Sequence, residues 1–134
     1  MGTDEIGLPR RLFRRQAKTT CLPWDTDYQA FKSQLVAALG QQFDSHPNLA
    51  GVYFSYAAMT NGIEMHWRVS EAEFTAAGYT EARLLNSYNT IMDMYNAAFP
   101  RTSIIMEVHE VFRSPTLAEN AFDYCQATMG SRCG

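Results

Sequence analysis

The chain has 134 residues, of which 46% are hydrophobic and 13% aromatic. This length and composition are those of one globular domain with a sizeable core, and they exclude a disordered chain. No apolar run approaches the roughly 20 residues needed to cross a bilayer, and the N-terminus lacks the apolar segment of a secretory signal. We therefore expect no membrane partner, while nothing in the sequence sets a cellular location.

The formal net charge of −3 is unevenly distributed. The first twenty residues hold five basic and two acidic side chains, and the rest of the chain holds six basic and twelve acidic ones. A basic arm can bind phosphates, but nucleic-acid surfaces add aromatic platforms, and only Phe13 is interleaved with these basic groups. We expect residues 1–20 to be a solvated lead-in segment, residues 21–134 to form the domain, and nucleic acid not to be a partner.

The clearest helical signal in the chain covers Thr26–Phe43. Thr26 with Gln29 three residues later fits a capping box, and the neighbouring Asp25 is favourably placed against the helix dipole. Because Pro47 disfavours a helical residue before it, the helix is expected to end near Phe43. Apolar residues recur at spacings of three or four, which predicts one apolar face: Tyr28, Phe31, Leu35, Leu39 and Phe43.

A strand, a polar excursion and two helices are expected next. Gly51–Tyr56 is rich in β-branched and aromatic residues, which predicts a strand, and the excursion Thr60–Arg68 follows it. Ser70 with Glu73 fits a second capping box that opens a short helix. Thr80 starts a longer helix that a proline closes. Its apolar side is expected to hold Leu84, Tyr88, Ile91, Met92 and Tyr95.

The last part of the chain predicts a strand and a helix. Ser103–Phe112 alternates between two faces, one with Ile104, Met106, Val108 and Phe112, the other with Ile105, Glu107, His109 and Val111. Pro115 and Thr116 start the helix. Its buried side is expected to hold Leu117, Ala121, Phe122, Cys125 and Met129. A bridge between Cys125 and Cys133 is compatible with the sequence, and so are reduced thiols.

Strands that alternate with helices in this order imply an α/β fold with parallel pairing and right-handed crossovers. Two strands cannot make a stable sheet alone. The lead-in segment, other copies of the chain or a larger barrel would have to complete the sheet. We therefore keep self-association through open sheet edges as an expectation.

Several short motifs resemble the middle of clan-A glycoside hydrolases, which are (β/α)₈-barrel enzymes of the broad β-galactosidase and cellulase type. The matching stretches are Pro23-Trp24-Asp25-x-x-Tyr28, Leu39-Gly40 with Phe43-Asp44 and Pro47, the strand Gly51-Val52-Tyr53-Phe54, Gly78-Tyr79-Thr80, Phe99-Pro100 and Ser103–His109. The resemblance covers roughly residues 20–130. It implies a partial TIM-barrel-like fold of parallel strands alternating with helices. Since a whole barrel runs to about 250 residues, the chain would be a central fragment.

The resemblance also implies a glycosidase site that acts on a carbohydrate substrate. In the family, the fourth strand ends in the acid/base glutamate, and here that position falls on Glu64. The family's glutamate usually follows an asparagine directly, whereas Glu64 follows Ile63 and Asn61 lies three positions earlier. The family's nucleophile comes from the seventh strand. This piece would therefore carry only the acid/base residue and be inactive alone.

Glu64 has the surroundings that suit a catalytic acid, because apolar and aromatic neighbours raise a carboxyl pKa. The substrate-binding residues we expect around it are Trp24, Asp25, Asn61, Trp67, Glu107 and His109. Trp67 would stack on a sugar, and His109 lies nearer the carboxyl end of its strand, where barrel sites form.

Each of these residues also has a purely structural interpretation. Glu64 would then be an ordinary solvated loop carboxylate, Asp25 a helix-start residue, and Glu107 a buried partner of a neighbouring polar group. The tryptophans and Tyr53 would serve a non-catalytic carbohydrate-binding or structural α/β module.

Other chemistries lack their motifs. Glu64-x-His66 with His109 does not have the HExxH spacing of a zinc site, and the three cysteines have no CxxC pair. Ser55 lacks the GxSxG elbow of an α/β-hydrolase. There is no GxGxxG or P-loop for a nucleotide. We expect no metal and no cofactor.

Overall fold

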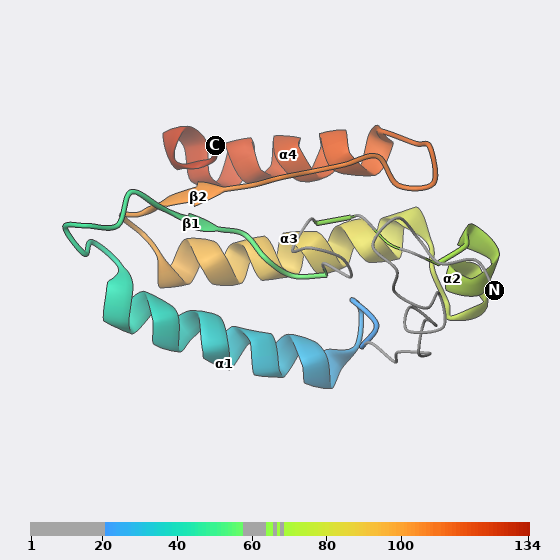
Figure 1. Ribbon diagram of the computed structural model, residues 1–134, viewed down its shortest axis with the longest axis horizontal. Helices are drawn as coiled ribbons and strands as arrows, with labels where there is room; N and C mark the ends of the chain where they lie inside the picture. The colour runs from blue at the N-terminus through green and yellow to red at the C-terminus, as the bar shows by residue number, and fades with distance from the viewer. Residues whose placement is uncertain (1–20, 58–63, 66, 68) are drawn as a thin grey trace, which may run out of the picture.

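The computed structural model describes residues 21–57, 64, 65, 67 and 69–134. Helices and short strands alternate along this part of the chain (Figure 1). In chain order the elements are α1 Thr26–Phe43, β1 Gly51–Tyr53, α2 Glu71–Ala76, α3 Glu81–Ala98, β2 Ser103–Ile105, α4 Thr116–Met129 and the 3₁₀ helix η2 Gly130–Arg132. The chain is therefore mixed α/β, as the sequence predicts.

The two strands pair in parallel, which confirms the predicted pairing. Gly51 lies opposite Ser103, and Tyr53 lies opposite Ile105. The end of the chain continues this pattern: Cys133 forms an isolated parallel bridge with Ile104. The Gly134 N–H donates to the Ile104 carbonyl at 3.0 Å. Cys133 and Gly134 thus lie along the edge of β2 that faces away from β1.

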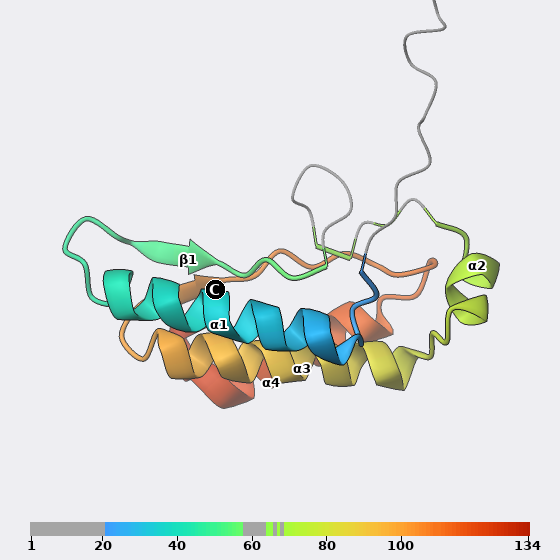
Figure 2. The same ribbon diagram turned by 90° about the horizontal axis from the view of Figure 1, so that it is seen from below.

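Helices α1, α3 and α4 lie on one side of the strands (Figure 2). Figure 2 shows β1 along one side of the molecule with α3 and α4 on the other, while α1 lies beside α3. The opposite face of the strands is open in the described part of the chain, where Tyr53 is 57% exposed and Ile105 is 37% exposed. No barrel is formed by these residues. In the described ranges, no helix is both long and apolar enough to cross a membrane.

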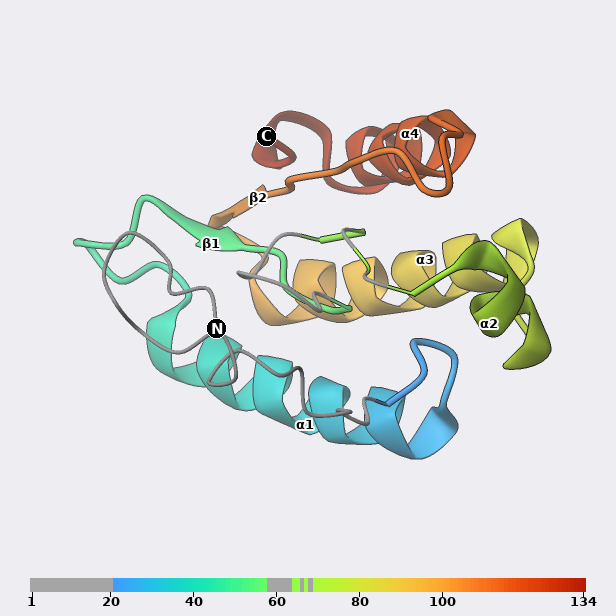
Figure 3. The ribbon, with the colours of Figure 1, turned by 45° about the vertical axis from the view of Figure 1, so that its right-hand side comes forward.

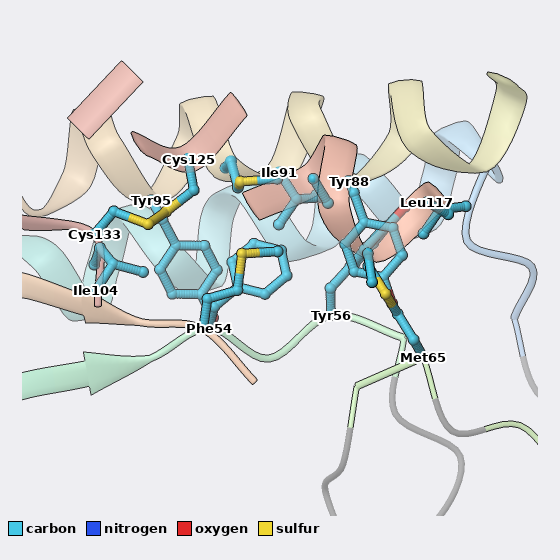
Figure 4. Close-up of a cluster of buried hydrophobic side chains, with 14 of the residues drawn as sticks. Phe54, Tyr56, Met65, Tyr88, Ile91, Tyr95, Ile104, Leu117, Cys125 and Cys133 are labelled. Carbon is cyan, nitrogen blue, oxygen red and sulfur yellow. A yellow bond between two sulfur atoms is a disulfide. The ribbon is translucent and has the colours of Figure 1, made fainter. Parts of the chain in front are cut away.

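The core lies between the strands and the α3–α4 pair. Phe54, just beyond β1, packs against Tyr88 and Tyr95 of α3 with ring centroids 5.8 Å and 5.2 Å apart. A disulfide joins Cys125 of α4 to Cys133. Of the two possibilities that the sequence leaves open, a bridge or reduced thiols, the structure has the bridge. Tyr88, Tyr56 and Met65 gather at one end of this cluster and the disulfide lies at the other (Figure 4).

The strands are shorter than the sequence predicts. β1 ends at Tyr53, although the Phe54 N–H still donates to the Ile105 carbonyl. The chain then turns away because the N–H groups of Tyr56 and Ala57 donate to a side chain, the Glu64 carboxylate. β2 ends at Ile105, and on the expected apolar face Ile104 within the strand and Met106 just after it are buried.

Helix α1 has the predicted bounds, but its N-cap is one residue earlier than expected. The Asp25 carboxylate, not the Thr26 hydroxyl, accepts the capping hydrogen bond, from the Tyr28 N–H at 2.8 Å. The buried side of the helix is formed by Val36 and Gly40. The expected apolar face is largely exposed instead: Phe31, Leu35, Leu39 and Phe43.

The later helices follow the sequence closely. Ser70 and Glu73 form the predicted capping box of α2, and Thr80 caps α3 by accepting from the Arg83 N–H. On α4, Phe122 is 38% exposed, so its predicted burial is wrong, whereas Leu117, Ala121, Cys125 and Met129 are buried as expected.

Candidate functional site around Glu64

The Glu64 carboxylate is buried and fully engaged with protein groups. Its side chain is 1% exposed. One oxygen accepts from the Tyr56 N–H at 2.5 Å, and the other accepts from the Ala57 N–H at 2.8 Å and the Tyr88 hydroxyl at 2.9 Å. These donors join the segment after β1 to α3. Glu64 is therefore not the solvated loop carboxylate of the structural interpretation.

Burial dominates the electrostatics of this group. Removal from water raises the pKa of Glu64, although the three hydrogen bonds and the positive charge of Lys32 act in the opposite direction. Lys32, half-buried on α1, has its own pKa lowered by burial, against the attraction of Glu64. A carboxyl group with these properties holds its proton to a higher pH than an exposed glutamate.

Tyrosine side chains surround the carboxylate. The rings of Tyr28 and Tyr56 stack with centroids 5.7 Å apart, and the Tyr28 hydroxyl donates to the Tyr56 carbonyl. The Tyr56 and Tyr88 rings meet edge to face at 5.3 Å. Burial raises the pKa of Tyr56 to about 12, so its hydroxyl is protonated at neutral pH. It accepts from the Gln29 side-chain amide at 3.1 Å.

Trp24 and Trp67 lie together against one phenylalanine. Their rings contact Phe74 of α2 with centroid separations of 5.2 Å and 5.0 Å. The Arg83 guanidinium lies over the Trp24 ring at 5.3 Å. The Trp67 indole N–H donates to the Ala57 carbonyl at 2.6 Å, which connects this aromatic cluster to the segment that holds Glu64. In Figure 3, α2 lies at the end of the molecule toward which β1 runs.

Glu107 and His109 follow β2 and lie beside each other. The His109 Nε2 is 3.2 Å from a Glu107 carboxylate oxygen, and both side chains are more than a third exposed. Glu107 is therefore not the buried structural partner that the alternative interpretation expects. The structure brings this pair together, but it gives neither side chain a contact with Glu64.

Asp25 and Asn61 are the remaining expected binding residues. Asp25 caps α1, as its structural interpretation predicts. Asn61 lies outside the described residues, as does the His66 of the rejected zinc motif. In the described part of the chain, no group of three or more histidine, cysteine or acidic side chains could hold a metal ion.

Two residues that shape this site are not predicted from the sequence. Tyr88 is predicted only as part of the apolar side of its helix, yet its hydroxyl is the side-chain donor to Glu64. Lys32 is the charged group that acts on the pKa of Glu64. Tyr88 is 24 positions from Glu64 in the chain, and Lys32 is farther away, so no local sequence motif indicates either residue. The hydroxyl group of Tyr88, on an otherwise apolar face of its helix, is the one hint that the sequence offers.

The described part of the chain is thus an α/β structure with two parallel strands and a buried carboxyl group, that of Glu64, beyond the first strand. Comparisons with protein-family models, with curated proteins and with solved structures find no match to this chain. The function must therefore be inferred from the side chains of the site itself.

Proposed function

We propose that this chain is part of a glycoside hydrolase-like (β/α) protein in which Glu64 is the acid/base residue. The observation that carries the proposal is a carboxyl group with a raised pKa, placed just beyond the end of a parallel strand. A glycosidase acid must keep its proton near neutral pH until the glycosidic oxygen takes it.

The chemistry needs a second carboxylate, and none of the described residues supplies one that acts on Glu64. Retaining enzymes place their two carboxyl groups about 5–5.5 Å apart, and inverting enzymes about 6.5–9.5 Å apart. Within the described residues, Lys32 is the charged group that shifts the pKa of Glu64, and no acidic side chain does so. The chain alone is therefore expected to bind sugar without hydrolysing it.

Sugar binding is the direct test of this proposal. In an NMR titration of the labelled chain with a panel of disaccharides, we expect shifts in the His109 ring, the Trp67 indole N–H and the Tyr56 and Ala57 amides. Glu64→Gln should weaken binding, while Glu71→Gln, on the exposed side of α2, should not. Absence of any shift at high millimolar sugar would overturn the proposal.

An aryl glycoside assay adds a second readout. Turnover that is lost in Glu64→Gln and kept in Glu71→Gln would support Glu64 as the acid/base residue and contradict the expectation that a nucleophile is missing. Turnover that survives Glu64→Gln would remove Glu64 from the proposed role.

A second candidate is a non-catalytic α/β module in which Glu64 anchors the segment after β1. It is favoured by the 1% exposure of Glu64 and by its three hydrogen bonds to protein donors. Loss of stability in Glu64→Gln, with no sugar binding by the unmodified chain, would select this candidate.

A further inference from the structure

Helix α1 carries an exposed row of large apolar side chains. Phe31 is 63% exposed, Leu35 42%, Leu39 37% and Phe43 42%. They follow one another at intervals of four residues, so they form a single ridge along the helix. We refer to these four residues as the α1 ridge. They make up more than half of the seven large apolar side chains exposed in the described part of the chain.

Among the described residues, the contact of α1 with the rest of the molecule does not involve this ridge. α1 packs on α3 through Val36 and Gly40, on a neighbouring flank of the helix. Gly40 lies so close to α3 that an added Cβ would fall 2.2 Å from the Ala98 carbonyl oxygen. The ridge cannot turn toward α3 without losing this close approach. Figure 1 shows α1 at the edge of the helical layer, on the side of α3 away from α4.

The order of residues in the ridge is symmetric. Read in either direction along the helix, it is phenylalanine, leucine, leucine, phenylalanine at equal spacing. A two-fold axis perpendicular to the helix brings the same surface of two copies together with their helices antiparallel. Each copy would then place Phe31 against Phe43 of the other, and Leu35 against Leu39. Large side chains meet at both ends of the contact and smaller ones at its centre.

Charge does not oppose this contact. Asp27 and Lys32 are the only charged residues in α1, and Ser33–Phe43 has none. In the antiparallel register, Lys32 lies opposite Gln42 of the other copy, so no like charges meet.

We propose that the α1 ridge is the interface of a symmetric dimer between two copies of this chain. Four side chains from each copy cover less than the roughly 800 Å² per partner of a standard interface. The dimer is therefore weak, and its population depends on concentration. The proposal is independent of the role of Glu64, because none of the four residues of the α1 ridge contacts Glu64 or acts on its pKa.

The oligomeric state of the full chain tests the proposal. Sedimentation equilibrium over a wide concentration range is expected to show a monomer–dimer equilibrium. Leu35→Glu should weaken the dimer by at least about tenfold, because a charge would replace a buried leucine. Phe122→Glu is the matched control: Phe122 is 38% exposed, close to the 42% of Leu35, but it lies on α4, so the dimer should persist. Circular dichroism checks that both variants are folded.

Opposite charges test the antiparallel register. Leu35→Glu and Leu39→Lys should each be monomeric alone and should form a heterodimer when mixed, because the two positions face each other. An equimolar mixture of Leu35→Glu and Leu35→Lys should stay monomeric, since these positions are about 6 Å apart along the helix axis in the antiparallel arrangement. A monomer at all concentrations, a dimer that survives Leu35→Glu, or association of the second mixture alone would each overturn the proposal.

Discussion

At the scale of single residues, burial and hydrogen bonding have opposite effects on the pKa of Glu64. Burial favours the protonated carboxyl, while the two N–H groups, the Tyr88 hydroxyl and Lys32 favour the carboxylate. Because the net effect raises the pKa, the folded state holds the Glu64 proton more tightly than the unfolded state does.

This sign leads to a prediction for Glu64→Gln. The stabilisation from the bound proton is fully present below the unfolded pKa, and it is lost as the pH rises through the folded pKa. The free energy of unfolding of the natural chain should therefore fall relative to that of Glu64→Gln as the pH rises above the ordinary glutamate value of 4.5. Urea unfolding from about pH 4 to about pH 8 measures this difference.

The opposite slope in that experiment would mean that the hydrogen bonds outweigh burial and that the folded pKa is depressed. Glu71→Gln serves as the control, since its carboxyl group is exposed on α2. It should leave the pH dependence of stability unchanged.

Tyr88→Phe tests the side-chain donor. The hydroxyl that donates to Glu64 is removed while the ring that packs on Phe54 and Tyr56 is kept. We expect a loss of about 1.5–3 kcal/mol of stability at a pH where Glu64 is ionised, and less at acidic pH. Tyr124→Phe removes an exposed hydrogen bond to Asp93 and should cost about 0.5 kcal/mol or less. Equal losses in both variants would contradict the role of Tyr88.

The sequence predicts part of this site and not the rest. Glu64 stands out because aromatic residues flank a carboxyl group just after a strand, and the structure does bury it. Its donors could not be predicted: Tyr88 is 24 residues away and joins the site only through the packing of α3. Trp24 and Trp67 are expected to be sugar platforms, yet each has Phe74 against its ring.

At the scale of elements, local signals set where the helices begin and end. Caps and proline act within a few residues, so the bounds of α1 and the capping box of α2 could be predicted. The choice of the buried face could not, because it depends on the partner. The apolar periodicity of α1 points to its large residues, but α3 packs on the flank with Gly40, where the two backbones can approach closely.

Gly40→Ala measures this close approach. Alanine stabilises a helix by about 1 kcal/mol relative to glycine, so propensity alone predicts a gain. Here the new methyl group would meet the Ala98 carbonyl at 2.2 Å, and the contact is with backbone. We expect the clash to dominate, with a net loss of about 1–3 kcal/mol in thermal or urea unfolding. Gln42→Ala, on the exposed side of the same helix, should change stability by only a few tenths of a kcal/mol. A stabilised Gly40→Ala would show that α1 can move away from α3 without loss.

At the scale of the whole molecule, the alternation of strands and helices predicts parallel pairing, because a helical crossover returns the chain to the same end of the sheet. β1 and β2 follow this rule. The extent of the sheet could not be predicted from the same pattern. Strand length depends on which groups take the backbone N–H donors, and Glu64 takes two of them beyond β1.

The disulfide holds the end of the chain beside β2, and its removal is the last prediction. Cys125 and Cys133 are eight positions apart, and Cys133 lies in parallel register with Ile104. Closing a loop of this size is worth about 2–3 kcal/mol in the chain-entropy model. A reducing agent should therefore lower the stability of the natural chain by about that amount and leave the double variant Cys125→Ser/Cys133→Ser unaffected.

Hydrogen exchange at the Met106 and Gly134 amides reports on the location of this loss. Met106 donates to the Gly134 carbonyl at 2.7 Å, and Gly134 donates to Ile104. Reduction should speed exchange at both amides more than at Phe54, which donates to Ile105 on the β1 side. Uniform acceleration at all three would mean that the bridge stabilises the molecule as a whole. Selective acceleration would mean that it pins the terminal residues to β2 while the β1–β2 pair is held by its own packing on α3.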